Sequence, residues 1–84
     1  MAAAYRYAIE QAAADVMLGL PQRDRWRLRD YFVRLAGEPF ADSPQRVPSE
    51  GGREYLVVAT DRFVITYWVD HAVARVCIMA IERA

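Results

Sequence analysis

Few side chains in this sequence could carry out chemistry by themselves. Cys77 is the single cysteine and His71 the single histidine, so they can form neither a disulfide within the chain nor a zinc site. Cys77 lies in an apolar run, where a thiol is far more often inert than reactive. His71 lies between Asp70 and Ala72 in a predicted turn, where an exposed, solvated imidazole is expected. The sequence indicates no metal site and no cofactor.

The remaining candidates for chemistry are arginines, which supply every basic residue of the chain. The 11 basic and 11 acidic residues cancel, so the protein as a whole has no net attraction to nucleic acid. An arginine can nonetheless bind a phosphate through two hydrogen bonds at once. Several arginines lie within residues 22–36. They form either a solvated helix surface or a surface for phosphates.

Three strands are predicted in the carboxyl-terminal part of the chain, at residues 55–59, 63–69 and 73–81. These runs are rich in Val, Ile, Tyr, Phe and Trp, and polar residues typical of turns separate them. The short gaps at residues 60–62 and 70–72 cannot carry a parallel crossover. Successive strands are therefore predicted to pair antiparallel, as a meander.

Alternation along residues 63–69 assigns the side chains of the middle strand to two faces of the sheet. Val64, Thr66 and Trp68 share one face, and the intervening residues share the other. Both faces are largely apolar, whereas a sheet with one wet face would show a polar residue at every second position. Each face therefore needs a cover, or one of them is a docking surface.

The amino-terminal half predicts a short strand at residues 5–9, followed by helices at 10–19 and 22–36. Leu20 and Pro21 separate the two helices, which must fold back as a hairpin. Residues 38–52 are rich in Pro and Gly and are predicted to be an irregular loop. The polar side of the second helix is expected in solvent and consists of Arg23, Asp24, Arg27, Asp30 and Arg34. Asp30 and Arg34 are predicted to form an ion pair.

These elements predict a single α+β domain covering residues 1–84. Both helices pack on one face of the antiparallel meander, and the first strand lies at its side. No apolar run is long enough to span a membrane, and the amino terminus is not a secretory signal, so we expect no membrane association and a cytoplasmic location. The side chains expected to be mostly buried are Trp26, Phe32, Leu35, Phe63, Ile65 and Tyr67.

Three segments of the sequence follow the pattern of a known family. FVITYWVD at residues 63–70 looks like its aromatic strand with Tyr and a Val-Asp turn, and VCIMAIER at 76–83 looks like its closing strand ending in Arg. Residues 5–39 are similar to its first strand and helical hairpin, with the final Leu-x-x-x-Pro. In the order strand, helix, helix, meander, the chain resembles the RelE/ParE superfamily of bacterial toxins over nearly its whole length.

The resemblance implies a toxin of a type II toxin-antitoxin system, held inactive by an antitoxin encoded beside it. Some members of the superfamily are ribosome-dependent ribonucleases that cut mRNA, whereas the ParE branch inhibits DNA gyrase. The ribonuclease branch places basic residues on the exposed sheet face and on the second helix, often with an aromatic or His near the carboxyl end. Those groups act on the ribose 2′-OH, the phosphate and the leaving oxygen.

This sequence departs from the ribonuclease pattern at several of these positions. Val64 stands where the family often has Arg, Thr66 and Trp68 cannot neutralise a phosphate, and no aromatic residue follows Arg83. The resemblance therefore implies a ParE-like, non-enzymatic toxin acting on a protein target such as DNA gyrase. The alternative is a ribosome-dependent mRNA endoribonuclease.

The candidate site residues follow from these two alternatives. If the protein cleaves RNA, Arg62 and Arg83 are the candidate catalytic residues. The expected partners are the antitoxin with gyrase or, alternatively, the ribosome and mRNA, and an exposed apolar face also predicts self-association of the isolated protein. The residues expected to bind the target or the antitoxin are Trp68, Thr66, Val64, Arg53 and Arg83.

Overall fold

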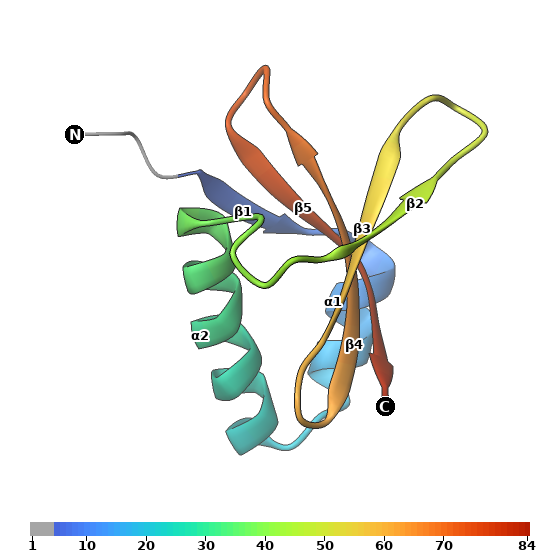
Figure 1. The fold of residues 1–84 in the computed structure, drawn as a ribbon. Helices are drawn as coiled ribbons and strands as arrows, with labels where there is room; N and C mark the ends of the chain where they lie inside the picture. Colours follow the sequence, from blue (N-terminus) through green and yellow to red (C-terminus); the bar gives the residue numbers. More distant parts are fainter. Residues whose placement is uncertain (1–4) are drawn as a thin grey trace.

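The computed structural model describes residues 5–84 and contains two helices and one five-stranded sheet. The helices form a hairpin between the first and second strands, and three of the strands follow one another at the end of the chain (Figure 1). The elements are β1 (Arg6–Ile9), α1 (Gln11–Leu18), α2 (Gln22–Gly37), β2 (Gln45–Pro48), β3 (Glu54–Ala59), β4 (Phe63–Asp70) and β5 (Arg75–Arg83).

The sheet confirms the predicted meander and adds a strand to each side of it. The strand order is β1-β5-β4-β3-β2, with β3, β4 and β5 antiparallel and β1 pairing parallel to β5. The prediction that residues 38–52 form only an irregular loop is wrong, because β2 pairs antiparallel with β3. The strand was not predicted because it contains Pro48, and proline is compatible with a strand only at a sheet edge.

The last strand begins two residues later than predicted, at Arg75 instead of residue 73. The turn before it is longer because Ala74 has a positive φ of 51°, which interrupts the extended backbone. The Asp70 carboxylate accepts a hydrogen bond from the Ala72 N–H (3.2 Å) and holds the start of this turn. His71 is exposed in the turn, as the sequence predicts.

Both helices contribute to one hydrophobic core on one face of the sheet. Phe32 and Tyr67 are its largest fully buried side chains, and each has no exposed surface. Of the six side chains predicted to be buried, five are buried and Trp26 is not. The cluster consists of Ala13, Leu20, Leu28, Phe32, Leu35, Ala36, Leu56, Val58, Phe63, Ile65, Tyr67, Val76, Ile78 and Ile81.

The prediction for Trp26 is wrong because helix geometry places it away from the sheet. The buried stripe of α2 runs through Asp24, Leu28 and Phe32 at intervals of four residues. Trp26 lies two residues from both Asp24 and Leu28, so it points to the far side and is 62% exposed. Asp24, predicted to be in solvent, is instead 3% exposed.

Cys77 is buried in β5, and burial raises the pKa of its thiol. A raised pKa keeps the thiol protonated near neutral pH and so lowers its reactivity. Neither α1 nor α2 is long and apolar enough to cross a membrane.

Tyr67 links the middle of the sheet to the loop after α2, because its hydroxyl donates a 2.5 Å hydrogen bond to the carbonyl oxygen of Pro39. Tyr67→Phe should therefore lower the free energy of unfolding by about 1 kcal/mol. Burial, with a smaller effect of Asp42, raises the pKa of Tyr67 from 10.0 to about 12. The stabilisation is thus fully present below pH 10 and is lost as pH rises through about 12.

Urea unfolding at pH values from 10 to 12 tests both expectations. The loss of stability over this range should be shallower in Tyr67→Phe than in the unmodified protein, because one tyrosine with a raised pKa has been removed. Tyr55→Phe is the matched control, since Tyr55 is only half-buried and forms no side-chain hydrogen bond to another described residue. Equal effects of the two substitutions would contradict this role of the Tyr67 hydroxyl.

Candidate functional site

The structure brings together the two arginines predicted as catalytic candidates. Phe63 at the start of β4 is the register partner of Arg83 near the end of β5, and Arg62 directly precedes Phe63. The backbone N–H of Ala84 also donates to the carbonyl oxygen of Arg62 (2.9 Å). Arg62 and Arg83 therefore lie side by side at one end of the sheet, although 21 positions separate them in sequence.

Arg62 at this end is held by an ion pair. Its guanidinium Nη1 lies 3.1 Å from Oδ1 of Asp24, in the first turn of α2. The Asp24 side chain is 4% exposed and that of Arg62 51% exposed, so the pair joins a buried carboxylate to a half-exposed cation. A buried carboxylate needs such a partner because it has lost its hydration. Arg62 therefore attaches the amino end of α2 to the β3–β4 turn.

The Arg83 side chain, unlike that of Arg62, is not held by an ion pair among residues 5–84. Its guanidinium carbon lies 5.9 Å from the centre of the Phe63 ring, and the side chain is exposed. The ion pairs within residues 5–84 are Asp24 with Arg62 and Arg46 with Glu54, so Arg83 has no carboxylate partner there. Of the two predicted catalytic candidates, Arg83 is the one available to bind an anion.

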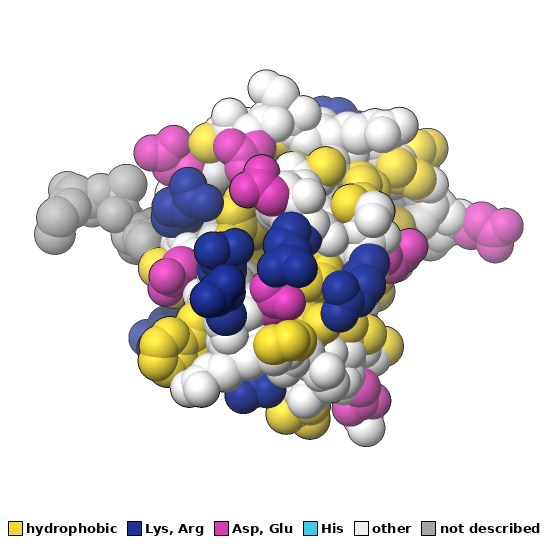
Figure 2. All heavy atoms as spheres, turned by 90° about the horizontal axis from the view of Figure 1, so that it is seen from below, with side chains coloured by type: hydrophobic (Ala, Val, Ile, Leu, Met, Phe, Trp, Pro, Cys, Tyr) yellow, Lys and Arg dark blue, Asp and Glu magenta, His cyan; other side chains and the backbone are white. Residues whose placement is uncertain are grey.

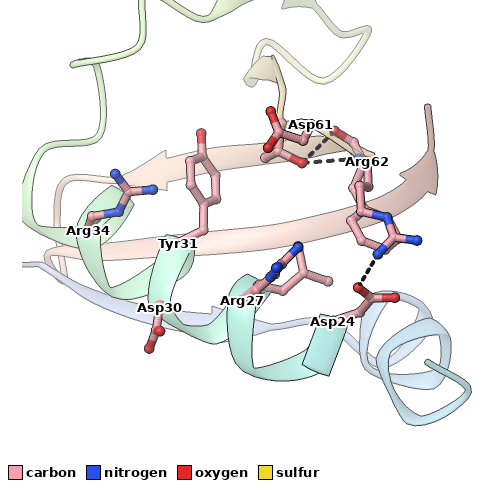
Figure 3. Close-up of a pocket in the computed structure, with 10 residues that line it drawn as sticks. Asp24, Arg27, Asp30, Tyr31, Arg34, Asp61 and Arg62 are labelled. Carbon is pink, nitrogen blue, oxygen red and sulfur yellow. Dashed lines mark hydrogen bonds and ion pairs between the residues drawn. The ribbon is translucent and has the colours of Figure 1, made fainter. Parts of the chain in front are cut away.

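A groove of about 270 Å³ lies beside this end of the sheet, between α2 and the β3–β4 turn. Figure 3 shows Arg27, Tyr31 and Arg34 rising from α2 on one side and Asp61 with Arg62 on the other. Basic and acidic groups alternate around it, so the groove has no strong charge of one sign. Its lining residues are Asp24, Arg27, Leu28, Asp30, Tyr31, Arg34, Thr60, Asp61, Arg62 and Phe63.

Figure 2 views the molecule from this end, where the amino end of α2, the β3–β4 turn and the carboxyl terminus lie. Basic side chains, all of them arginines, gather in the middle of this face with acidic and apolar side chains between them. The predicted ion pair between Asp30 and Arg34 does not form. The Arg34 guanidinium instead lies 5.4 Å from the centre of the Tyr31 ring.

Tyr31 is a groove residue that the sequence analysis did not identify. Its hydroxyl donates a 2.9 Å hydrogen bond to Oδ2 of Asp42, in the loop after α2. Burial, and then this hydrogen bond, raise the pKa of Tyr31 above its ordinary value. The phenol therefore stays protonated at neutral pH, where it cannot act as a base and is a weaker proton donor than an ordinary tyrosine. No sequence spacing links Tyr31 to Asp42, because the loop between them is irregular.

The sheet face opposite the helices, here called the helix-free face, carries Val57, Val64, Thr66 and Trp68. All four side chains are half-buried, so they form a sheet surface that none of the described elements covers completely. This confirms that Val64, Thr66 and Trp68 share one face. A bulge between Thr66 and Tyr67 interrupts the pairing with β5 and increases the local twist of the strand.

Trp68 on this face is covered by Arg53, which precedes β3. The Arg53 guanidinium carbon lies 3.7 Å from the centre of the Trp68 ring system, close enough for a cation–π interaction. The indole N–H is enclosed and has no hydrogen-bond acceptor among the described residues. Arg53 and Trp68 lie at the opposite end of β4 from Arg83. The predicted binding residues thus belong to two separate places on the sheet.

No protein-family model matches the chain, and no curated protein matches it significantly. Solved structures do match: the RelBE2 toxin–antitoxin complex from Mycobacterium tuberculosis has a TM-score of 0.83 at 16% identity, covering 98% of this chain and 100% of that one. The RelE–RelB complex from Pyrococcus horikoshii has a TM-score of 0.79 at 15% identity, covering 96% of each chain.

The chain has the fold of the RelE proteins in these complexes. A third match, the intact RelBE complex of E. coli, has a TM-score of 0.76 at 16% identity and covers 96% of this chain. The RelE-like fold accounts for the element order and for the sheet that packs both helices on one face. At sequence identities this low, the roles of residues in those structures cannot be transferred to residues of this chain.

The ion pair of this RelE-like fold predicts that Arg62 is structural. Arg62→Ala should lower the free energy of unfolding by roughly 1–3 kcal/mol, because it leaves a buried carboxylate without its partner. Arg83→Ala, the matched control at the same end of the sheet, should change stability by less than about 0.5 kcal/mol. Chemical denaturation followed by far-UV circular dichroism measures both.

A second substitution tests the cause. Asp24→Asn in the Arg62→Ala background should recover part of the lost stability, because the neutral amide requires no cation. If Arg62→Ala is as mild as Arg83→Ala, the ion pair does not hold α2 to the sheet.

Proposed function

We propose that this protein is the toxin of a type II toxin-antitoxin system. The observation that supports this most strongly is the match of nearly the whole chain, at a TM-score of 0.83, to a structure described as a toxin–antitoxin complex. The helix-free face agrees with it, because a half-buried apolar sheet surface is suited to a protein cover. In this proposal the protein acts in the cytoplasm and is neutralised there by an antitoxin encoded beside it.

Within this proposal, the fold comparisons favour the RelE branch over the ParE branch that the sequence analysis preferred. The matching structures named above are all RelE proteins, so mRNA cleavage at the ribosome becomes the leading mechanism for this chain. In such cleavage the ribose 2′-oxygen attacks the adjacent phosphorus, and the 5′-oxygen leaves and takes up a proton. The transition state carries extra negative charge on the phosphate oxygens.

In this mechanism Arg83 would stabilise that charge. It is exposed, has no carboxylate partner within residues 5–84, and lies at the sheet end where the arginines gather. Arg27 and Arg34 of the adjacent groove could bind flanking phosphates. Glu82 is the register partner of Val64 and is exposed, so it is the carboxylate of the helix-free face next to Arg83 in the chain.

Inhibition of a protein target, such as DNA gyrase, remains the second candidate because of one observation. Arg53 stacked on Trp68 beside apolar side chains is the kind of Arg and Trp anchor that dominates protein interfaces. Both mechanisms would arrest growth, and they differ in whether mRNA or a protein target such as gyrase is affected first.

Induction of the protein in bacterial cells distinguishes the two mechanisms. We expect growth arrest with rapid cleavage of mRNA and unchanged DNA supercoiling, measured by primer extension and plasmid topoisomers. Arg83→Ala should slow cleavage by about a hundredfold or more, the usual effect of removing one well-placed donor to the transition state. Arg75→Ala, an exposed arginine at the other end of β5, is the matched control and should cleave normally.

Loss of supercoiling and an SOS response before any mRNA cleavage would transfer the assignment to gyrase inhibition. Normal growth after induction of the folded protein would contradict the toxin proposal itself.

Binding of the antitoxin tests the helix-free face. Val64→Glu places a charge on this surface and should weaken the complex about tenfold or more, because the carboxylate would have to be desolvated. Val33→Glu is the matched control, since Val33 is an exposed valine of α2. Isothermal titration with the product of the neighbouring gene measures both, after circular dichroism has shown that each variant is folded. Equal affinities would place the antitoxin elsewhere on the toxin.

A further inference from the structure

A cavity of about 480 Å³ lies at the opposite end of the sheet from Arg83. The β2–β3 and β4–β5 turns both point toward this end, away from the carboxyl terminus (Figure 1). The lining includes Arg53 and the residues before it in the β2–β3 turn, Trp68 in β4, His71 just after β4, and Phe40 from the loop after α2. The volume lies within the usual range for small-molecule sites.

Flat groups form two parts of this lining. The Arg53 guanidinium carbon lies 3.7 Å from the centre of the Trp68 ring system. The rings of Phe40 and His71 are nearly parallel, at 16° to each other, with their centres 6.4 Å apart. Nucleobases bind proteins by stacking on aromatic rings and on guanidinium planes. The lining therefore favours a planar heterocycle over an aliphatic ligand.

His71 is held in a way that leaves one ring nitrogen available to a ligand. The Tyr5 hydroxyl lies 2.9 Å from Nδ1 of His71, and the two rings are at 80° to each other. The other nitrogen, Nε2, has no hydrogen-bond partner among residues 5–84. Because a nucleobase carries donors and acceptors along its edge, Nε2 can pair with one of them. Contacts with Tyr5 and Phe40 thus orient the imidazole before any ligand binds.

Arg53 supplies the unpaired charge of the cavity. Glu54, the acidic residue of the lining, is paired with Arg46 at 2.5 Å. Arg53 is in no ion pair within residues 5–84. A guanidinium donates hydrogen bonds from its edge, so Arg53 can bind a phosphate while its face stays on the Trp68 ring. The cavity therefore favours an anionic ligand.

Acidic residues next to the cavity indicate a ligand with one phosphate. Glu50 directly precedes Gly51 of the lining, and Asp70 directly precedes His71. The successive phosphates of a nucleic acid strand would approach these carboxylates, and like charges repel. One phosphate at Arg53 avoids this repulsion. The charge around the cavity thus fits a mononucleotide better than a chain of nucleotides.

We propose that this cavity binds a nucleoside monophosphate, with its base stacked on the side of Phe40 and His71 and its phosphate on the edge of the Arg53 guanidinium. This site goes beyond the proposed toxin function, because it requires neither an antitoxin nor the sheet end that carries Arg83. Adenosine 5′-monophosphate is a suitable probe of this ligand class.

Titration of the ¹⁵N-labelled protein with adenosine 5′-monophosphate tests the site, because each of the two tryptophans gives one indole N–H signal. The Trp68 N–H is enclosed and has no acceptor among the described residues, so its signal reports changes at its own ring and at the Arg53 guanidinium that covers it. We expect this signal to shift saturably at nucleotide concentrations up to about 1 mM. The signal of the exposed Trp26 is the internal control and should not move.

Two variants locate the ligand. Phe40→Ala should weaken binding at least about fivefold, the usual effect of losing one ring that stacks on a base. Phe40 is 41% exposed, so its truncation leaves the core intact. Arg53→Gln should weaken binding about tenfold or more, because the phosphate loses a charged donor. The matched controls, Trp26→Ala and Arg75→Gln, replace an exposed aromatic residue and an exposed arginine outside the cavity and should change the affinity less than about twofold.

Each contrary outcome contradicts a stated part of the proposal. Absence of a saturable shift of the Trp68 signal, or equal affinities of Phe40→Ala and the unmodified protein, would overturn the site. Adenosine, which lacks the phosphate, should bind at least about tenfold more weakly, and equal binding would overturn the role of Arg53. An oligoadenylate that binds more tightly than the mononucleotide would overturn the assignment of a ligand with one phosphate. None of these results alters the toxin proposal, which growth arrest tests separately.

Discussion

The pleat of β4 decides which side chains of this protein become core and which become surface. β4 is the central strand, paired on one side with β3 and on the other with β5, so its alternation sets the alternation of both neighbours. A shift of one residue would exchange Ile65 and Tyr67, which have no exposed surface, with the half-buried Thr66. Tyr67 adds a hydrogen bond to Pro39 that fastens the loop after α2. The helix-free face exists because the helices can cover only the other one.

Ion pairing then determines which arginines are available for function. The sequence has 11 basic residues and an equal number of acidic ones, but position in the fold separates their roles. Asp24 is buried in the first turn of α2 and requires Arg62, so that arginine maintains the helix position. Arg53 covers Trp68, whereas Arg83 has no carboxylate partner within residues 5–84. The result is a RelE-like fold in which the exposed sheet face offers apolar contacts and the cations lie at its ends.

This arrangement places two features of the proposed toxin in different regions. In the proposed function, contacts with phosphate would occur at the sheet end that carries Arg83 and the α2 groove, while a protein partner would bind the helix-free face. A partner that covers the face from β1 toward β4 would pass over Cys77, which is buried and chemically quiet.

The sequence by itself determined the α+β class, the helical hairpin and the antiparallel meander, because these depend on local periodicity and on gaps too short for a crossover. It also assigned Val64, Thr66 and Trp68 to one face, since alternation is a local property. Tertiary structure alone decided the rest. β2 forms only because β3 supplies its hydrogen bonds, and Asp24 is buried only because Arg62 reaches it from 38 residues away. The orientation of α2, which exposes Trp26 and buries Asp24, depends on contacts with the sheet that no spacing within the helix specifies.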